Sequence, residues 1–65
     1  MQVIKITLAA ARVNAGLTQA EVAKKLKISR QTLVSWEKGL TEPSVSQADE
    51  LARLYNFPRD CIFFK

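Results

Sequence analysis

Three helix N-terminal signals constrain the fold of this sequence more than any other feature. Thr18 is followed three residues later by Glu21, and Ser44 by Gln47, so each pair can form a capping box. In a capping box, each side chain bonds the backbone N–H of the other residue and satisfies groups that a helix start leaves unpaired. Ser29 is a third good N-cap residue. We therefore expect several short helices joined by tight turns.

Apolar residues recur at helical spacing between these signals. The spacing predicts five helices, over residues 7–15, 18–26, 29–38, 44–55 and 58–63. Gly16 and Gly39 suit the left-handed turn that follows a helix, and the predicted apolar faces include Ala15 and Val45. Residues 2–6 alternate polar and apolar side chains, a pattern compatible with a short strand. The predicted fold class is all-α.

Length and composition allow one small domain with little equipment for chemistry. The chain has 65 residues, 48% of them apolar and 25% charged, which suits a thin single core. It has no His and only Cys61, which excludes a Cys/His zinc site, a His-based triad and an intramolecular disulfide. Asp49, Glu50 and Asp60 form no nucleophile–base pair. We expect no enzyme activity, no metal or cofactor, and no small-molecule ligand.

The start of the chain and its apolar runs bear on location. Residues 1–8 are too short and too interrupted by Lys5 for a signal peptide. No apolar run in the sequence approaches the ~20 residues that a membrane-spanning helix needs. We therefore expect a cytoplasmic protein without a membrane partner.

The positive charge is concentrated in the first part of the chain. The net charge of +4 and the pI near 9.7 point to a polyanionic partner. Residues 1–38 carry seven Lys and Arg against two Glu, a net +5, and residues 39–65 carry three against four, a net −1. A solvated basic surface would give the same excess, so the charge alone leaves the nature of the partner open.

The helix expected over residues 29–38 has an outward strip with the chemistry of a base-reading surface. Leu33 and Trp36 are expected to face the core, and the residues left outside are Arg30, Gln31, Val34, Ser35 and Lys38. Arginine forks onto guanine, glutamine pairs with adenine, valine suits a thymine methyl, and serine bonds several base edges. Lys38, with Thr18 and Gln19 at the preceding helix start, suits phosphates. In isolation, ordinary solvated helix residues would look the same.

Two runs of sequence resemble the Cro/repressor type of helix-turn-helix, called the XRE family. They are GLTQAEVA at residues 16–23 and ISRQTLVSWEKG at residues 28–39, and residues 43–55 and 60–63 are similar to that family's fourth and fifth helices. The resemblance covers about residues 8–63. It implies a compact, five-helix, lambda-repressor-like domain spanning residues 1–65, with its helix-turn-helix at 18–38. It further implies a sequence-specific regulator of transcription, a repressor, that places the helix at 29–38 in the major groove of double-stranded DNA.

The resemblance also implies roles for single residues. Together with the strip, it predicts base contacts by Arg30, Gln31, Val34 and Ser35. The predicted contacts to the DNA backbone are Thr18, Gln19, Ser29, Thr32 and Lys38. Arg12 and Glu37 match a structural ion pair between the first and third helices. Lys27 stands where many relatives have Gly, so a left-handed turn there costs about 1 kcal/mol.

The apolar run at residues 61–64 bears on oligomeric state. Ile62 and Phe63 are expected to close the core, whereas Phe64 is harder to bury on the same face. Relatives commonly form homodimers through this region to read two half-sites, so Phe63 and Phe64 are the candidate dimer contacts. An alternative is a protein-interaction module, such as an antitoxin or adaptor, that uses the same fold. The basic first half and the outward strip favour DNA.

Overall fold

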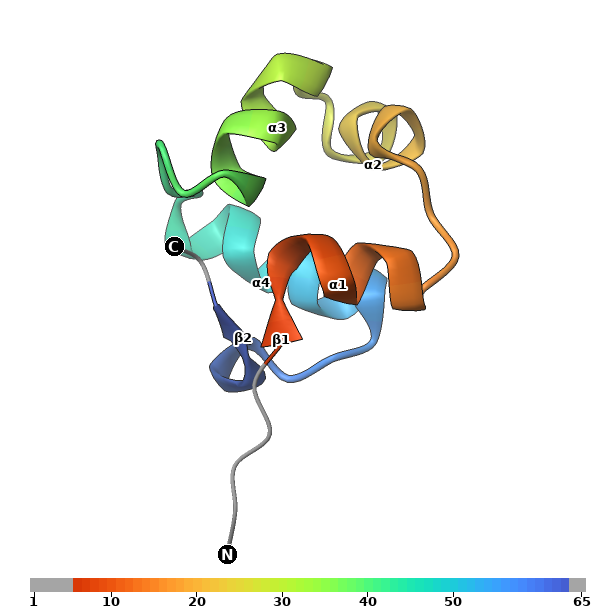
Figure 1. Cartoon of the computed structure of the whole chain (residues 1–65), viewed down its shortest axis with the longest axis vertical. Helices are drawn as coiled ribbons and strands as arrows, with labels where there is room; N and C mark the ends of the chain where they lie inside the picture. Colours follow the sequence, from red (N-terminus) through yellow and green to blue (C-terminus); the bar gives the residue numbers. More distant parts are fainter. Residues whose placement is uncertain (1–5, 64–65) are drawn as a thin grey trace, which may run out of the picture.

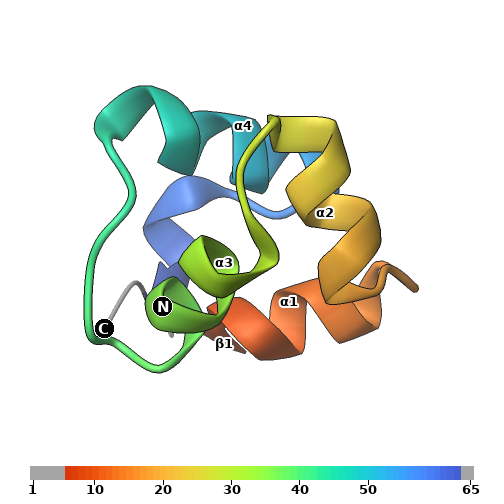
Figure 2. The same ribbon diagram turned by 90° about the horizontal axis from the view of Figure 1, so that it is seen from above.

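The computed structural model describes residues 6–63. In chain order these form β1 (Ile6–Thr7), α1 (Leu8–Asn14), α2 (Gln19–Leu26), α3 (Arg30–Glu37), α4 (Val45–Tyr55), a 3₁₀ turn (Arg59–Cys61) and β2 (Ile62–Phe63). Helices α2 and α3 lie together at one end of the molecule and the two strands at the other, with α1 and α4 between them (Figure 1). Seen from the α2–α3 end, α1 and α4 flank α3 on two sides (Figure 2). Within this part of the chain, no helix is long and apolar enough to span a membrane.

Side-chain caps start all four of these helices. In each case the cap oxygen accepts a hydrogen bond from the backbone N–H three residues later, and the caps are Thr7, Thr18, Ser29 and Ser44. Both predicted capping boxes are confirmed, because Thr18 and Glu21 bond each other's backbone, as do Ser44 and Gln47. The helix starts are therefore fixed by hydrogen bonds that span three residues.

The core takes one large, fully buried side chain from each helix. These side chains are Leu8, Val22, Leu33 and Leu51. Trp36 also faces inward, as predicted, and Ile62 from β2 closes the same cluster. The predicted apolar faces were wrong at two positions that lie at helix ends. Ala15 follows the last residue of α1 and is exposed, and Val45 is the first residue of α4 and lies clear of the core.

The predicted fifth helix over residues 58–63 is wrong, whereas the helical class of the fold is confirmed. One 3₁₀ turn is followed by β2, which pairs in parallel with β1, so that Ile6 lies opposite Ile62 and Thr7 opposite Phe63. A β-branched residue such as Ile62 fits a half-buried strand well, and six residues are too few for apolar spacing to distinguish helix from strand. Of the segment 2–6, only Ile6 lies among the described residues, and it belongs to β1.

The joint between α2 and α3 is short and tightly bonded. Lys27 adopts the left-handed conformation, with φ of 58°, as expected for the position where many relatives have Gly. The Ile28 N–H then donates to the Ala23 carbonyl at 3.0 Å. Ile28 packs against the core, and the small side chain of Ala23 is buried. This joint sets α3 across the end of α2 and turns one side of α3 to solvent.

Candidate nucleic-acid interface

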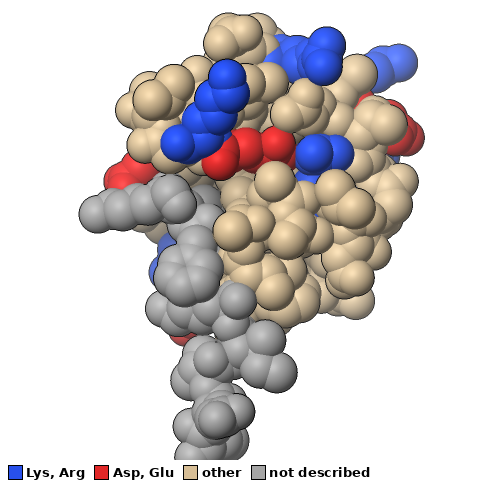
Figure 3. All heavy atoms as spheres, in the orientation of Figure 1, with Lys and Arg blue, Asp and Glu red and all other residues tan. Residues whose placement is uncertain are grey.

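The outer side of α3 carries the four residues predicted to contact bases. Arg30 and Gln31, in the first turn, are exposed, and Val34 and Ser35, one turn later, are partly exposed. Their spacing places them on one side of the helix, because Leu33 and Trp36 point into the core. Lys and Arg side chains gather at the end of the molecule that α2 and α3 form (Figure 3). Several basic side chains therefore lie around this side of α3.

The residues predicted to contact the DNA backbone lie at the ends of the same two helices. Lys38, at the C-terminal end of α3, is exposed. At the other end of α3, the Ser29 and Thr32 hydroxyl oxygens are 2.8 Å apart and share a hydrogen bond. Thr18 Oγ1 accepts from the Glu21 N–H. Among the described residues, no partner takes the backbone N–H groups in the first turn of α2, those of Gln19 and Ala20.

An ion pair joins α1 to the last residue of α3. Arg12 Nε donates to Glu37 Oε2 at 2.8 Å, and the two side chains are 15% and 7% exposed. Arg12 Nη1 also donates to the Leu17 carbonyl at 2.9 Å. The arginine therefore ties α3 to α1 and to the loop that leads into α2.

Gln19 extends this ion pair towards the outer side of α3. Its Nε2 donates to Glu37 Oε1 at 2.9 Å, and its Oε1 accepts from Arg30 Nε at 3.3 Å. Arg12, Glu37, Gln19 and Arg30 thus form one polar network. Sequence reasoning placed Gln19 only at the DNA backbone and missed this network. No local spacing signals it, because its members come from three helices.

Two titratable groups among the described residues have altered pKa values. The Thr18 backbone N–H, and after it the Thr18 hydroxyl, lower the pKa of the Glu21 carboxyl below its ordinary 4.5. A negative charge in the first turn also suits the positive end of the α2 dipole. Burial raises the pKa of the Tyr55 hydroxyl well above 10.0, and the nearby Glu37 charge adds to this shift. The Tyr55 hydroxyl is buried and has no hydrogen-bond partner among the described residues.

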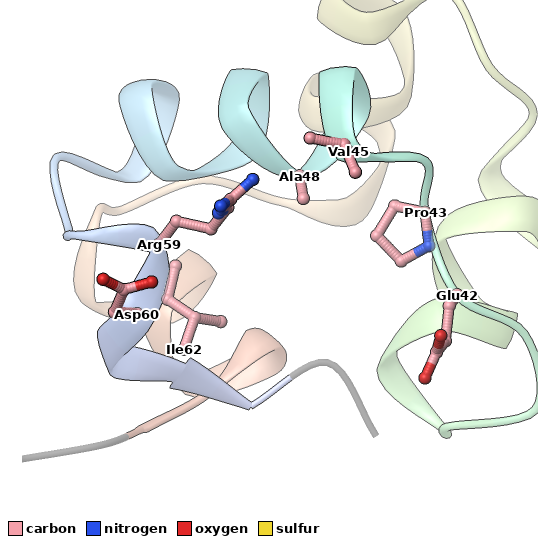
Figure 4. Close-up of a pocket in the computed structure, with 7 residues that line it drawn as sticks. All are labelled: Glu42, Pro43, Val45, Ala48, Arg59, Asp60 and Ile62. Atoms are coloured by element: carbon pink, nitrogen blue, oxygen red, sulfur yellow. The ribbon is translucent and has the colours of Figure 1, made fainter.

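A groove lies between the loop after α3, the first turns of α4 and the 3₁₀ turn (Figure 4). Its volume is about 540 Å³, and it is lined by Glu42, Pro43, Val45, Ala48, Arg59, Asp60 and Ile62. The lining combines apolar side chains with charges of both signs. The candidate dimer contacts cannot be placed against this groove, because Phe64 and the side chain of Phe63 lie outside the described residues.

The described residues hold few groups suited to catalysis or metal binding. Within residues 6–63, no three His, Cys, Asp or Glu side chains gather as metal ligands. Cys61 is half-buried and carries a free thiol. Asp49 pairs with Arg59 at 3.2 Å across the surface, and both side chains are nearly half exposed.

Comparisons with known proteins agree on one family. Residues 8–60, from α1 into the 3₁₀ turn, match the family model described as Helix-turn-helix. The chain is 43% identical over 47 residues to an uncharacterized HTH-type transcriptional regulator of Methanocaldococcus jannaschii, a match that covers 72% of this chain and 71% of the relative. Two uncharacterized HTH-type transcriptional regulators of Archaeoglobus fulgidus are similar. One is 44% identical, over a match that covers 69% of this chain and 64% of the relative. The other is 38% identical, over a match that covers 80% of this chain and 73% of the relative. No solved structure gives a significant match.

Proposed function

The chain belongs to the Cro/repressor, or XRE, type of the helix-turn-helix family, and on this premise we propose that it binds double-stranded DNA sequence-specifically and regulates transcription. The family is one of DNA-binding regulators rather than enzymes. The observation that carries the proposal is the exposed pair Arg30 and Gln31 in the first turn of α3. That turn is the part of a recognition helix that meets base edges in the major groove. In this proposal residues 1–65 act as one domain, with the helix-turn-helix at 18–38.

In this proposal four side chains of α3 read the bases. The Arg30 guanidinium forks onto guanine O6 and N7, and the Gln31 amide pairs with adenine N6 and N7. One turn later, Val34 contacts a thymine methyl and Ser35 bonds a base edge. Each bidentate pair discriminates against the wrong base by about 1–3 kcal/mol.

Phosphate contacts at both ends of the helix pair hold α3 in register. The Gln19 and Ala20 N–H groups at the start of α2 suit one phosphate. Lys38, at the far end of α3, suits another, and the hydroxyls of Thr18, Ser29 and Thr32 add neutral contacts. Such contacts fix orientation but carry no sequence information, and they make the affinity fall steeply with salt.

The proposal includes a homodimer that acts as a repressor by occupying its operator. A second copy of the chain would lie on the groove between α4 and the 3₁₀ turn, and Phe63 and Phe64 are proposed as further contacts of the dimer. Two observations support this occupant. Val45, which lines the groove, is 70% exposed, and the groove is also lined by Arg59 and the acids Glu42 and Asp60. A two-fold contact can therefore pair opposite charges of the two copies. Two recognition helices would then meet half-sites about one DNA turn apart.

The test of DNA reading starts with a preferred duplex selected from a random library with the purified chain. We expect Arg30→Ala and Gln31→Ala each to weaken binding to that duplex about 10- to 100-fold, because each removes a bidentate base contact. Arg53→Ala is the matched control, since it removes one exposed arginine from α4. Unchanged binding by both α3 variants would contradict the proposal. A protein partner retained after loss of Arg30, Gln31 and Lys38 together would favour the interaction-module alternative.

The dimer is tested by sedimentation equilibrium with two matched variants. Val45→Glu places a charge in the wall of the groove, and Val13→Glu places one on α1, where the valine is 64% exposed. We expect only Val45→Glu to shift the chain to monomers and to remove cooperative binding to a duplex with two half-sites. Equal behaviour of the two variants would count against the groove as the dimer contact.

A further inference from the structure

We propose that Glu37 positions the Arg30 side chain for base reading, through the Gln19 amide, in addition to pairing with Arg12. The inference rests on the proposed function, since it assigns Arg30 to a base. Its geometric basis is a row of three hydrogen bonds. Arg12 donates to Glu37 at 2.8 Å, Gln19 donates to Glu37 at 2.9 Å, and Arg30 donates to Gln19 at 3.3 Å.

Glu37 determines which way the Gln19 amide faces. A carboxylate only accepts hydrogen bonds, so the end of the amide that meets Glu37 must be the NH₂ group. The Glu37 side chain is 7% exposed, and Arg12 occupies its other oxygen. A flipped amide would set the Gln19 carbonyl against a carboxylate in a partly buried site. The Gln19 carbonyl is therefore held towards Arg30.

The fixed carbonyl in turn selects the part of Arg30 that is left for DNA. Arg30 donates its Nε–H to Gln19 Oε1, and the two terminal nitrogens, Nη1 and Nη2, remain free. Arg30 would then approach guanine end-on, with both terminal nitrogens on O6 and N7. Without this contact, the exposed Arg30 side chain would lose conformational freedom when it binds DNA, and this loss would reduce the affinity. The second hydrogen of Gln19 Nε2 stays available for a phosphate.

The measured quantity is the guanine preference, which is the ratio of two dissociation constants. The first is for a duplex changed at the base pair that Arg30 reads, and the second is for the preferred duplex. That base pair is the one at which Arg30→Ala loses its preference. For the wild type we expect a ratio of about 10 to 100.

Two variants break the network at different points. Gln19→Met removes both amide hydrogen bonds and leaves the Arg12–Glu37 pair intact. Glu37→Gln replaces the carboxylate with an amide, which presents either a donor or an acceptor and no longer orients Gln19. We expect each variant to lower the guanine preference at least threefold, towards the Arg30→Ala value. Adding Glu37→Gln to Gln19→Met should lower it no further, because Glu37 acts through Gln19.

Thr32→Val is the matched control for lost affinity. It removes a proposed phosphate contact from α3 and should weaken binding to both duplexes equally, so the guanine preference stays at the wild-type value. Partial unfolding of a variant does not change this ratio, because both dissociation constants are measured with the same fraction of folded protein. Gln19→Met keeps the inference open to refutation even if Glu37→Gln fails to fold.

The outcomes separate this inference from the proposed function. If the wild type selects no preferred duplex, the proposed function fails. If a preferred duplex and the Arg30 position are found, but Gln19→Met and Glu37→Gln keep the wild-type guanine preference, the inference is overturned and the function stands. A loss of preference in both single variants, with no further loss in the double variant, supports it.

Discussion

Arg12 Nε and Glu37 Oε2 lie 2.8 Å apart, and the pair connects the first helix of the fold to the last residue of α3. Both side chains are largely removed from solvent, so each charge depends on the other for compensation. The pair therefore sets the position of α3 relative to α1, and the direction in which the outer side of α3 faces follows from it.

The first prediction concerns the stability that depends on this pair. Arg12→Met leaves the Glu37 charge without its cation, and we expect the free energy of unfolding to fall by about 3 kcal/mol. Urea unfolding followed by circular dichroism measures the change. The matched control is Arg59→Met, which breaks the exposed pair with Asp49 and should cost less than about 1 kcal/mol. Similar losses in the two variants would contradict the buried role of Arg12.

The second prediction concerns the left-handed residue between α2 and α3. Lys27 has a φ of 58°, which strains any residue with a Cβ. We expect Lys27→Gly to raise the free energy of unfolding by about 0.5 kcal/mol, since relief of strain exceeds the added entropy of the unfolded chain. The control Lys25→Gly lies within α2, where glycine should cost about 1 kcal/mol. Thermal unfolding of the two variants should therefore shift in opposite directions.

The third prediction concerns the buried Tyr55 hydroxyl. Because it has no partner among the described residues, Tyr55→Phe should leave the stability at neutral pH unchanged or raise it by up to about 1 kcal/mol. The raised pKa of Tyr55 also makes the stability of the fold depend on pH in the alkaline range. Below pH 10.0 both states are protonated, and above it the unfolded chain ionises first, so the wild type loses stability as pH rises.

Denaturation of the wild type and Tyr55→Phe over the alkaline range measures this difference. The phenylalanine variant should lose less stability above pH 10.0. Tyr55 is the only tyrosine of the chain, so phenolate absorbance follows it alone. A large destabilisation at neutral pH would mean that the hydroxyl is hydrogen-bonded after all.

The fourth prediction concerns acid. The pKa of Glu21 is lowered from 4.5, so the folded chain holds the carboxylate better than the unfolded chain does. The stability that this contributes is complete above pH 4.5 and is lost as pH falls through the lower folded pKa. Glu21→Gln should flatten this acid dependence, measured as urea midpoints against pH. The matched control is Glu50→Gln, which removes one exposed carboxylate from α4. If the acid dependence of the urea midpoint flattens equally in this control, the assignment to Glu21 is contradicted.

The helix starts could be predicted from the sequence because capping is local. Thr18 and Glu21, or Ser44 and Gln47, need only three residues of chain to find each other. The end of the chain could not be predicted in the same way. The partner of Ile62 is Ile6, which lies at the other end of the described chain. Helical spacing over six residues carries no information about such a pairing.

The same contrast applies to the candidate site. The outward placement of Arg30 and Gln31 follows from helical periodicity once Leu33 and Trp36 are assigned to the core. The contact between Arg30 and Gln19 does not follow from periodicity, because it depends on how α2 crosses α3 and on which way the Gln19 amide faces. Periodicity predicts positions along a helix. Of the bonds between helices, the Arg12–Glu37 pair was expected from the family resemblance, and the bonds of Gln19 to Glu37 and Arg30 were not.

The register of β1 against β2 has a consequence for the order in which the chain folds. Helices α2 and α3 meet through neighbouring segments and close only a short loop, whereas Ile6 pairs with Ile62 across nearly the whole chain. During synthesis, β1 has no strand to pair with until Ile62 has left the ribosome. The α2–α3 pair can therefore assemble before the sheet closes. Because Ile62 belongs to the buried cluster, a chain in which the two strands have not yet paired leaves part of that cluster uncovered.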